Sequence, residues 1–436
     1  MYKTKTHNSR PTSFYRDKSW FIAGLVTVFV LFFVIWSFGE PFSGLSNFIP
    51  TDCSPADKSI LVDRENDPPE TTFYDDPELT YTLDNPIKDW DAKRKEWLRL
   101  HPTFIPGARN RTLILTGSQP SPCKFPAGDH LLLRTFKNKV DYARIHGHGI
   151  FYANSLFNPK MKSYWAKIPL VRAAMLAHPE SEWIMWVDSD AIFTDMDFKV
   201  PLERYKHHNF VVHGWPDMIY EKRSWVAVNA GIFLIRNCQW SMEFLDVWGR
   251  MGPQNPDYEK SGQILRSTLS DKMFPESDDQ STLVYLLLKE KKKWGDMMYV
   301  ENEYYLHGYW VETLAKLDNA SVLYEKIEKK TANLRRRHAE VVRESYGKMW
   351  EEVLGDSGGS RRPFITHFTG CQPCSGKSNE AYKGDDCWVG MEKALNFADN
   401  QVLRSFGFWH PDLRSGSISP LPFDFPGDEN EPEGLV

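Results

Sequence analysis

The most apolar stretch of the chain runs from Trp20 to Phe38 and is hydrophobic on every helical face, apart from isolated Ser and Thr hydroxyls. With a rise of about 1.5 Å per residue, a helix of this length spans about 28 Å, close to the thickness of a bilayer core. A cleaved signal peptide is the alternative, but its apolar region would be shorter and followed by a small-residue cleavage site. We therefore expect a transmembrane signal anchor over residues 20–39.

Charges on either side of this span indicate its orientation. Five Lys or Arg residues and one Asp precede it, whereas no Lys or Arg follows until Lys58. The positive-inside rule then predicts a cytosolic tail at residues 1–19 and a luminal location for everything after the anchor. Residues 40–89 are rich in acidic residues and Pro, which indicates a solvated luminal stalk. The folded domain is expected at residues 90–436.

Within this domain, short runs of β-branched and aromatic residues alternate with stretches of helical periodicity. This alternation predicts an α/β sheet covered by helices on both faces, with ligands bound beyond the carboxyl ends of strands. The predicted strands are 111–116, 150–152, 182–187, 209–213, 231–235 and 298–300, and the predicted helices are 168–178, 240–248 and 281–290. A charged helical segment at 319–355 suggests no function.

Composition narrows the class of protein. Hydrophobic residues at 41% and charged residues at 25% are typical of globular proteins and argue against a mainly disordered chain. The net charge of −5 gives no field that would gather nucleic acid, so we expect no nucleic-acid partner. Aromatic residues reach 14%; their flat rings suit sugar faces as well as cores.

Two further patterns concern a luminal location. Asn110 and Asn319 each begin an N-glycosylation acceptor tripeptide. Six cysteines could form disulfides in an oxidising lumen. The spacing of Cys371 and Cys374 resembles half of a zinc site, but no second such pair exists, and a disulfide or free thiols are favoured. The connectivity stays open.

The strongest chemical signal is Asp188-Ser189-Asp190, which directly follows the apolar strand predicted at 182–187. Two carboxylates at this spacing can turn toward one hard divalent cation, which would neutralise the departing diphosphate of a nucleotide-sugar donor. A solvated turn is the plain alternative. A phosphatase of the haloacid dehalogenase type is another, although its nucleophilic Asp normally follows the first strand of its domain, and here a strand comes earlier.

Other candidate positions are weaker when taken alone. Asp278, Asp279 and Gln280 stand at a helix start, where capping explains one carboxylate more readily than two. A lone His is usually structural, yet one that follows a strand in a chain with a candidate pair of metal-binding acids could complete the site. Further candidates near a ligand, or at the start of the 168–178 helix, are Lys167, Asn229-Ala230-Gly231, His307-Gly308 and His367 with Gly370.

Residues of about 85 to 412 resemble plant glycosyltransferase family 34. The segments that carry the resemblance begin at Trp165 (WAKIPLVR), Met185 (MWVDSDAIFTDMDF), Val211 (VVHGW), Val228 (VNAGIFLIRNCQWS), Glu276 (ESDDQS), Tyr304 (YYLHGYW), Thr366 (THFTGCQPC) and Leu395 (LNFADNQVLRSFGF). They follow one order and cover nearly all of the predicted luminal domain.

The resemblance implies a retaining, Mn²⁺-dependent transferase of the GT-A (Rossmann-like) fold, anchored in the Golgi membrane as a single-pass type II protein. It implies Asp188 and Asp190 as metal ligands, with His367 as the third. Asp278, Asp279 and Gln280 would face the reacting sugar and the acceptor. The resemblance does not decide which acid faces the sugar. Because one side chain can cap the helix while its neighbour projects into the cleft, we expect Asp279 to face the sugar and Gln280 to hold an acceptor hydroxyl. The UDP-sugar donor would be lined by Lys167, Ser189, Asn229, Ala230, Gly231, His307, Gly308 and Gly370.

Gln372 helps to distinguish between galactose and xylose as the donor sugar. Xylosyltransferase members tend to have Lys at this position near the diphosphate, and the NAGIFLIRN segment also looks more like the galactomannan branch. We therefore expect transfer of α-galactose from UDP-galactose to O6 of mannosyl units in β-1,4-mannan. The alternatives are a xyloglucan α-1,6-xylosyltransferase that uses UDP-xylose on β-1,4-glucan, and a non-catalytic glycan-binding partner in a Golgi complex. Homo- or hetero-oligomers with other cell-wall glycosyltransferases are compatible with each.

Overall fold

The structure is a computed structural model that describes residue 76 and residues 79–107, 110–331, 344–356, 361–383 and 385–421. These residues belong to one compact unit spanning 67–436. The predicted cytosolic tail, the anchor at 20–39 and most of the stalk lie outside the described residues. Among the helices of the described part, none has the length and apolar character needed to cross a membrane.

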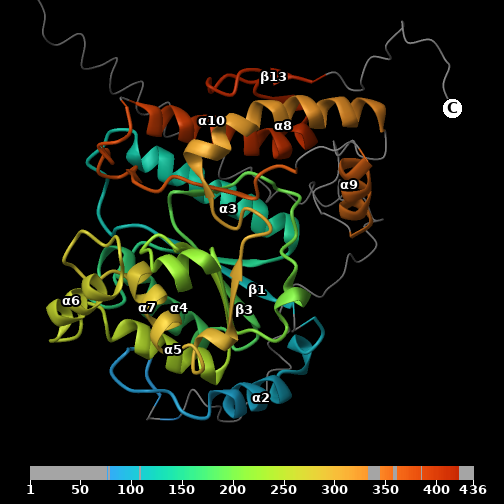
Figure 1. The fold of residues 1–436 in the computed structure, drawn as a ribbon. Coiled ribbons are helices and arrows are strands. Elements are labelled where there is room, and N and C mark those ends of the chain that lie inside the picture. Colours follow the sequence, from blue (N-terminus) through green and yellow to red (C-terminus); the bar gives the residue numbers. More distant parts are fainter. Residues whose placement is uncertain are drawn as a thin grey trace, which may run out of the picture. The chain divides into compact units, whose positions relative to one another are not determined.

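The core of the unit is a six-stranded mixed sheet with the order β2-β1-β3-β6-β5-β7 (Figure 1). Strand β6 runs antiparallel to both β3 and β5, and the other neighbours are parallel. All six predicted strands are present. Their bounds are β1 Thr112–Gly117, β2 Gly149–Ala153, β3 Trp183–Val187, β5 Phe210–Gly214, β6 Val228–Arg236 and β7 Met298–Glu301.

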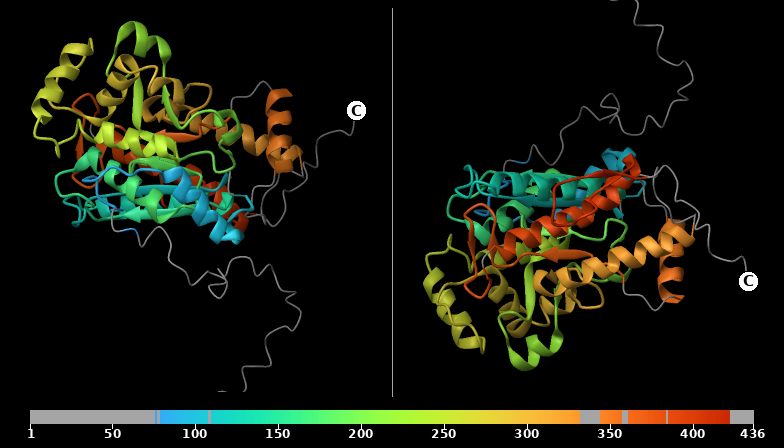
Figure 2. Two further views of the ribbon diagram at one scale, coloured as in Figure 1. Left: turned by 90° about the horizontal axis from the view of Figure 1, so that it is seen from below. Right: turned by 90° about the horizontal axis from the view of Figure 1, so that it is seen from above.

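Helices cover both faces of this sheet, as predicted. Alternate residues of β3 enter different cores: Ile184 and Trp186 pack with α4, α5 and α7, whereas Trp183, Met185 and Val187 pack with α3 and α10. Figures 1 and 2 show these layers, and α10 packs against α3 and α8. The helices are α2 Trp90–Leu100, α3 Gly128–His146, α4 Lys167–Ala177, α5 Gln239–Gly249, α6 Tyr258–Thr268, α7 Asp279–Lys289, α8 Trp310–Lys330, α9 Glu344–Asp356 and α10 Asp386–Leu403.

Short helical turns connect these elements. Five are 3-10 helices, and η9 is a turn of π-helix. They are η5 Pro102–Phe104, η7 Ser163–Ala166, η8 Leu202–Tyr205, η9 Met218–Lys222, η10 Gly295–Met297 and η12 Arg404–Phe406. The predicted helices at 168–178, 240–248 and 281–290 correspond to α4, α5 and α7, and the charged helical segment predicted at 319–355 overlaps α8 and α9. No helix was predicted at α2, α3, α6 or α10.

A second, three-stranded sheet brings distant parts of the chain to the end of β3. Its order is β4 (Ala191–Phe193), β9 (Ile365–His367) and β8 (Gly308–Tyr309). In this sheet His367 pairs in register with Ala191, which lies one residue after Asp190. The pairing therefore delivers a histidine from near the C-terminus to the two acids, although more than 170 residues separate them along the chain.

The folded unit begins before the predicted boundary at residue 90. Arg172, whose side chain is fully buried in α4, donates to the backbone oxygens of Thr80, Thr82 and Asn85. Ile87 is also buried and belongs to the main core. A buried guanidinium needs hydrogen-bond acceptors, and the end of the predicted stalk supplies them. Residues 79–89 are therefore part of the fold.

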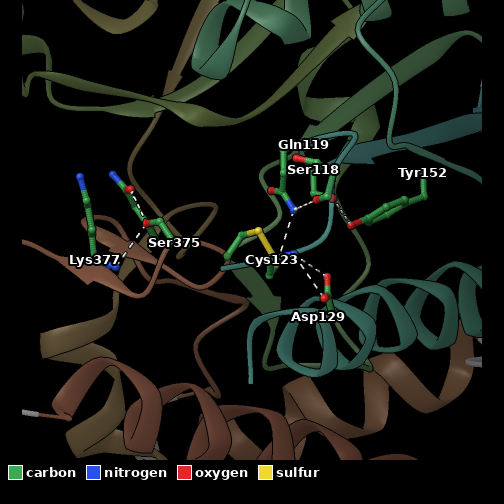
Figure 3. Close-up of a disulfide and its surroundings, with 10 residues drawn as sticks. Ser118, Gln119, Cys123, Asp129, Tyr152, Ser375 and Lys377 are labelled. Carbon is green, nitrogen blue, oxygen red and sulfur yellow. Dashed lines mark hydrogen bonds between the residues drawn. A yellow bond between two sulfur atoms is a disulfide. The ribbon is translucent and has the colours of Figure 1, made fainter. Parts of the chain in front are cut away.

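Two disulfides hold a small hairpin of β10 (Cys371–Gln372) and β11 (Lys377–Ser378). Cys374 is bonded to Cys123 in the loop after β1 (Figure 3). Cys371 is bonded to Cys387 at the start of α10. The favoured disulfide interpretation of Cys371 and Cys374 is therefore confirmed, and the half-zinc alternative is excluded, since each sulfur is bonded to a different cysteine. A second hairpin pairs β12 (Phe408–Trp409) with β13 (Ser419–Pro420).

Candidate active site

Asp188 and Asp190 lie at the carboxyl end of β3, in the short connection to β4. The backbone fixes this connection, because Asp188 N donates to Gly231 O at 2.9 Å and Ala191 N donates to Asp188 O at 3.1 Å. The indole N–H of Trp186 donates to Asp188 Oδ1 at 2.6 Å. Both carboxylates remain partly exposed, so a ligand can reach them.

His367 completes a group of three residues that could hold a cation. One ligand atom from each of Asp188, Asp190 and His367 lies within 4.8 Å of the others. His367 Nε2 is 3.2 Å from Asp190 Oδ1 and 3.9 Å from Asp188 Oδ2. Two carboxylate oxygens and one imidazole nitrogen form a donor set that fits a divalent cation such as Mn²⁺. The structure thus brings together the three predicted metal residues.

His307 orients the third member of this group. Its Nδ1 lies 3.0 Å from Nδ1 of His367, and the two rings meet edge to face. Burial lowers the pKa of His307 well below its usual range, so this imidazole is neutral. If His367 Nδ1 carries the proton and donates it to His307, the lone pair on His367 Nε2 faces the two carboxylates.

Gly231 is required because no side chain fits at its position. A Cβ atom built there would lie 2.7 Å from Asp188 Oδ2 and closer still to the ring of His367. The neighbouring Asn229 accepts a hydrogen bond from Gly231 N at 3.0 Å through its side-chain oxygen. The Asn229-Ala230-Gly231 segment of β6 therefore forms the floor beside the three candidate ligands.

A buried ion pair joins this cluster to helix α7. Lys167 Nζ lies 2.8 Å from Asp279 Oδ2 and 3.5 Å from Asp188 Oδ1, and it donates to Ala230 O at 2.9 Å. Burial opposes the charge of Lys167, but the carboxylates of Asp188 and Asp279 outweigh it and raise its pKa. Burial also raises the pKa of Asp279 to about 6, against the lowering effect of Lys167.

Asp278 and Asp279 have different surroundings. Asp278 is the N-cap of α7: its Oδ1 accepts from Ser281 N at 2.8 Å, and its Oδ2 pairs with Lys272 Nζ at 2.6 Å. Both of its carboxylate oxygens are therefore engaged within the protein. Asp279 points instead toward Lys167 and the acids at the end of β3. This difference favours Asp279 over Asp278 for a catalytic role.

The side-chain amide of Gln280 is engaged at both ends. Its oxygen accepts from Ala230 N at 3.3 Å, and its nitrogen donates to Trp225 O at 3.1 Å. Gln280 thus ties the start of α7 to β6 and to the loop before it. This geometry supports a positioning role rather than the predicted contact with an acceptor hydroxyl.

The remaining predicted residues divide into two groups. Ser189 lies between the two acids and is partly exposed. Gly308 and Gly370 serve the local backbone: a Cβ at Gly308 would collide with Ile365 O across the β8–β9 pair, and Gly370 adopts a φ of +81° after β9. Both glycines therefore support the segment that carries His367.

Lys139 is a site residue that the sequence analysis missed. It projects from α3, is fully buried, and donates to Ala191 O at 2.7 Å and to Ser189 O at 3.5 Å. Burial lowers its pKa to about 7, against the attraction of Asp190 and Asp188. No local signal separates Lys139 from the other basic residues of α3, because only the tertiary fold brings it beneath the Asp188–Asp190 turn.

An α/β sheet with acids and an imidazole at a strand end, next to a buried Lys–Asp pair, defines a site suited to a divalent cation and a phosphorylated substrate. Residues 108–378 match the model of the galactosyl transferase GMA12/MNN10 family. The chain belongs to this family of glycosyltransferases.

Curated relatives agree with this assignment. The chain is 55% identical over 436 residues to putative glycosyltransferase 7 of Arabidopsis thaliana, covering 98% of this chain and 96% of the relative. It is 59% identical over 363 residues to galactomannan galactosyltransferase 1 of Cyamopsis tetragonoloba, covering 83% of each. It is 44% identical over 373 residues to probable xyloglucan 6-xylosyltransferase 3 of Arabidopsis thaliana, covering 85% of this chain and 73% of the relative.

Similarity to solved structures is weaker. A glycosyltransferase involved in the glycosylation of the major capsid of PBCV-1 matches with a TM-score of 0.31 and 16% identity, covering 44% of this chain and 83% of that one. The glycosyltransferase GlyE of Streptococcus pneumoniae TIGR4 matches with a TM-score of 0.31 and 13% identity, covering 68% and 64%.

Proposed function

We propose that the protein is a retaining, Mn²⁺-dependent α-1,6-galactosyltransferase of the GT-A type, which transfers galactose from UDP-galactose to O6 of mannosyl units in β-1,4-mannan. The observation that carries the proposal is the convergence of Asp188, Asp190 and His367 next to the Lys167–Asp279 ion pair. This arrangement offers a cation site for a diphosphate and a carboxylate beside it for the sugar.

The cation would be held by Asp188, Asp190 and His367. Bound there, it would neutralise the charge that develops on the departing diphosphate. Lys139 holds the turn with Asp188 and Asp190 in place through its hydrogen bond to the carbonyl of Ala191. His307 holds the ring of His367 through the contact between their Nδ1 atoms. The protein therefore supplies a fixed set of ligands before the donor arrives.

Asp279 is the residue we assign to the reacting sugar. Lys167 fixes the orientation of its carboxylate at 2.8 Å, close to the acids at the end of β3. An ionised Asp279 would stabilise positive charge on the sugar ring as the bond to UDP breaks. Retention then follows from attack of the acceptor O6 on the face that UDP leaves, with the acceptor proton passing to the β-phosphate oxygen. The alternative is a covalent intermediate on Asp279.

The preference for galactose over xylose rests on two observations. Identity is 59% to a relative named as a galactomannan galactosyltransferase and 44% to one named as a probable xyloglucan xylosyltransferase. Gln372 is exposed on the β10–β11 hairpin, and the residue opposite it in register is Lys377. Figure 3 shows this hairpin beside the loop after β1. Gln372 itself carries no charge, which fits the galactomannan branch of the family resemblance rather than the xylosyltransferase branch.

One assay tests the proposal. The full-length protein, purified in detergent, is supplied with Mn²⁺ and with either UDP-galactose or UDP-xylose, each with mannan or glucan oligosaccharides. We expect transfer of galactose to mannan, α-linkage in the product by NMR, and loss of transfer with EDTA. Transfer of xylose to glucan would establish the alternative. Undiminished transfer in EDTA would exclude the metal site.

We also propose that the protein is a single-pass type II protein of the Golgi membrane with its catalytic domain in the lumen. The apolar span at 20–39 and the basic residues before it support this topology. In sealed Golgi vesicles, added protease should leave the domain intact until detergent is added. The exposed Asn110 and Asn319 should carry N-glycans in this topology. Removal of these glycans by a glycosidase would agree with it. Digestion of the domain without detergent would overturn it.

A further inference from the structure

Large apolar side chains are exposed on two loops next to the candidate active site. Trp215, after β5, is 40% exposed, and Val226, just before β6, is also 40% exposed. Met273, in the loop that leads to α7, is 82% exposed. Keeping such side chains in water is unfavourable, and a cluster of them beside a site points to a ligand. We call Trp215, Val226 and Met273 the apolar ledge.

Hydrogen bonds hold the segments of the ledge together. Trp215 N donates to Ala227 O at 2.9 Å, which places Trp215 beside the residue that follows Val226. Asp271 accepts from Trp225 N at 2.7 Å and from Ser224 Oγ at 2.5 Å, which fixes the second loop against the first. Beneath them the rings of Trp225 and Phe274 meet edge to face at 5.3 Å. The ledge is therefore a fixed surface made from several segments.

The ledge is continuous with the candidate active site. Gln280 bonds both to Trp225 O and to Ala230 N, so it spans the gap between the ledge and the floor of the site. On the other side, the ring of Trp215 is 4.8 Å from His213, which is 5.5 Å from His307. Ala230 lies in β6, whereas Val226 lies in the turn that precedes this strand. The ledge thus lies beyond the end of β6 that carries the floor of the site, where further units of an oligosaccharide would bind.

Three charged side chains that border the ledge already have partners. Lys272 pairs with Asp278 and lies over the ring of Phe274 at 3.1 Å, and Asp271 accepts two hydrogen bonds from the neighbouring loop. Lys222 pairs with Asp217. Paired charges do not select a charged ligand, so an uncharged one with flat apolar faces fits this surface best.

We propose that the apolar ledge binds additional sugar units of the acceptor polysaccharide, with the ring of Trp215 stacked on a pyranose face. The ledge would hold the chain while one unit lies at Asp279, and so would make long acceptors better substrates than short ones. This inference takes one thing from the proposed function, which is that the acceptor is a neutral β-1,4-linked polysaccharide. It does not depend on which donor sugar is transferred.

Direct binding tests the ledge. The affinity of the full-length protein for mannohexaose, mannobiose and cellohexaose is measured by calorimetry in the presence of UDP and Mn²⁺. In Trp215→Ala we expect the Kd for the preferred hexaose to rise about tenfold, the scale of one lost aromatic contact. The Kd for UDP and the rate of donor hydrolysis without acceptor should not change. Phe406→Ala removes an exposed ring in η12 and serves as the matched control.

Two further variants separate stacking from simple hydrophobicity. Trp215→Phe keeps a flat ring and should retain most of the affinity, whereas Trp215→Leu keeps apolar volume without a ring and should behave like Trp215→Ala. If thermal melting shows that Trp215→Ala is destabilised, the double variant Val226→Ser with Met273→Ala carries the test, since both side chains are exposed. The same loss of hexaose affinity is expected there.

The outcomes separate the two proposals. Unchanged hexaose affinity in every ledge variant overturns the ledge and leaves the proposed function intact. Failure of the wild-type protein to bind either hexaose overturns both. A change in sedimentation coefficient on replacing Trp215, without loss of sugar binding, would make the ledge a contact between two copies of this chain.

Discussion

His307 and His367 face each other through their Nδ1 atoms, 3.0 Å apart. Because burial keeps His307 neutral, a single proton shared by the two Nδ1 atoms decides which tautomer His367 adopts. The His367 tautomer with the proton on Nδ1 leaves Nε2 free for a cation. His307 thus acts on the metal site without being one of its ligands.

This relationship predicts that His307→Ala weakens Mn²⁺ binding by about 10- to 100-fold, as loss of an orienting partner does at other metal sites. A titration followed by electron paramagnetic resonance measures the affinity without any substrate. His307→Asn, whose amide oxygen can still accept the proton of His367, should recover part of it. His178→Ala, at a histidine paired only with Glu180, is the control. Equal affinity in His307→Ala and wild type would contradict the assignment.

Gly231→Ala should abolish Mn²⁺ binding, because the new methyl group would lie 2.7 Å from Asp188 Oδ2 and must displace that ligand or His367. The same titration tests this, together with thermal melting to show that the domain still folds. Gly355→Ala, at an α9 position where a Cβ meets nothing within 4 Å, should bind Mn²⁺ normally. Normal binding by Gly231→Ala would mean that the cation sits elsewhere.

Asp278→Asn and Asp279→Asn should fail in different ways. In Asp278→Asn the amide oxygen can still cap α7. The buried Lys272, however, would lose its carboxylate partner. Asp278→Asn should therefore lower the free energy of unfolding by about 3 kcal/mol. Turnover per folded molecule should stay near normal. Asp279→Asn should fold and bind UDP but lose turnover by orders of magnitude. Urea unfolding and steady-state rates measure the two effects; near-normal turnover in Asp279→Asn would remove its catalytic role.

The pKa of Asp279 predicts how the pH profile of kcat/KM falls on its acidic side, the acidic limb. Burial raises this pKa from 3.8 to about 6, so the carboxylate is protonated below about pH 6 and kcat/KM should fall there. Lys167→Met removes the charge that lowers this pKa, so any residual activity should show the limb at higher pH. The raised pKa also means that ionised Asp279 destabilises the fold, an effect that grows as pH rises from about 4 to about 6. A limb that does not move in Lys167→Met would assign it to another group.

Local patterns in the sequence predicted the elements that depend on local physics. The strand at 182–187 is apolar throughout and the acids follow it at once, so both the strand and Asp188 with Asp190 could be identified. Helix α4 was also predicted, since Ile168, Val171 and Met175 keep helical spacing. These signals need only neighbours along the chain.

Features that depend on tertiary contacts could not be predicted in this way. The antiparallel direction of β6, the burial of Lys139 under the Asp188–Asp190 turn, and the bonds of Arg172 to residues 80–85 all join distant segments. His367 was assigned to the metal through the family resemblance, and the β4–β9 pairing explains how it reaches the site. The distinction between Asp278 and Asp279 required the geometry of the helix start.

The bond between Cys123 and Cys374 also constrains when the protein can finish folding. The two cysteines are 251 residues apart, so at about 5 to 20 residues per second Cys123 waits roughly 13 to 50 s during synthesis before its partner exists. Cys371, and later Cys387, emerge within the same short interval. The hairpin with Gln372 and Lys377 is therefore among the last parts to be fixed, and the loop after β1 lacks its disulfide until nearly the whole chain has been made.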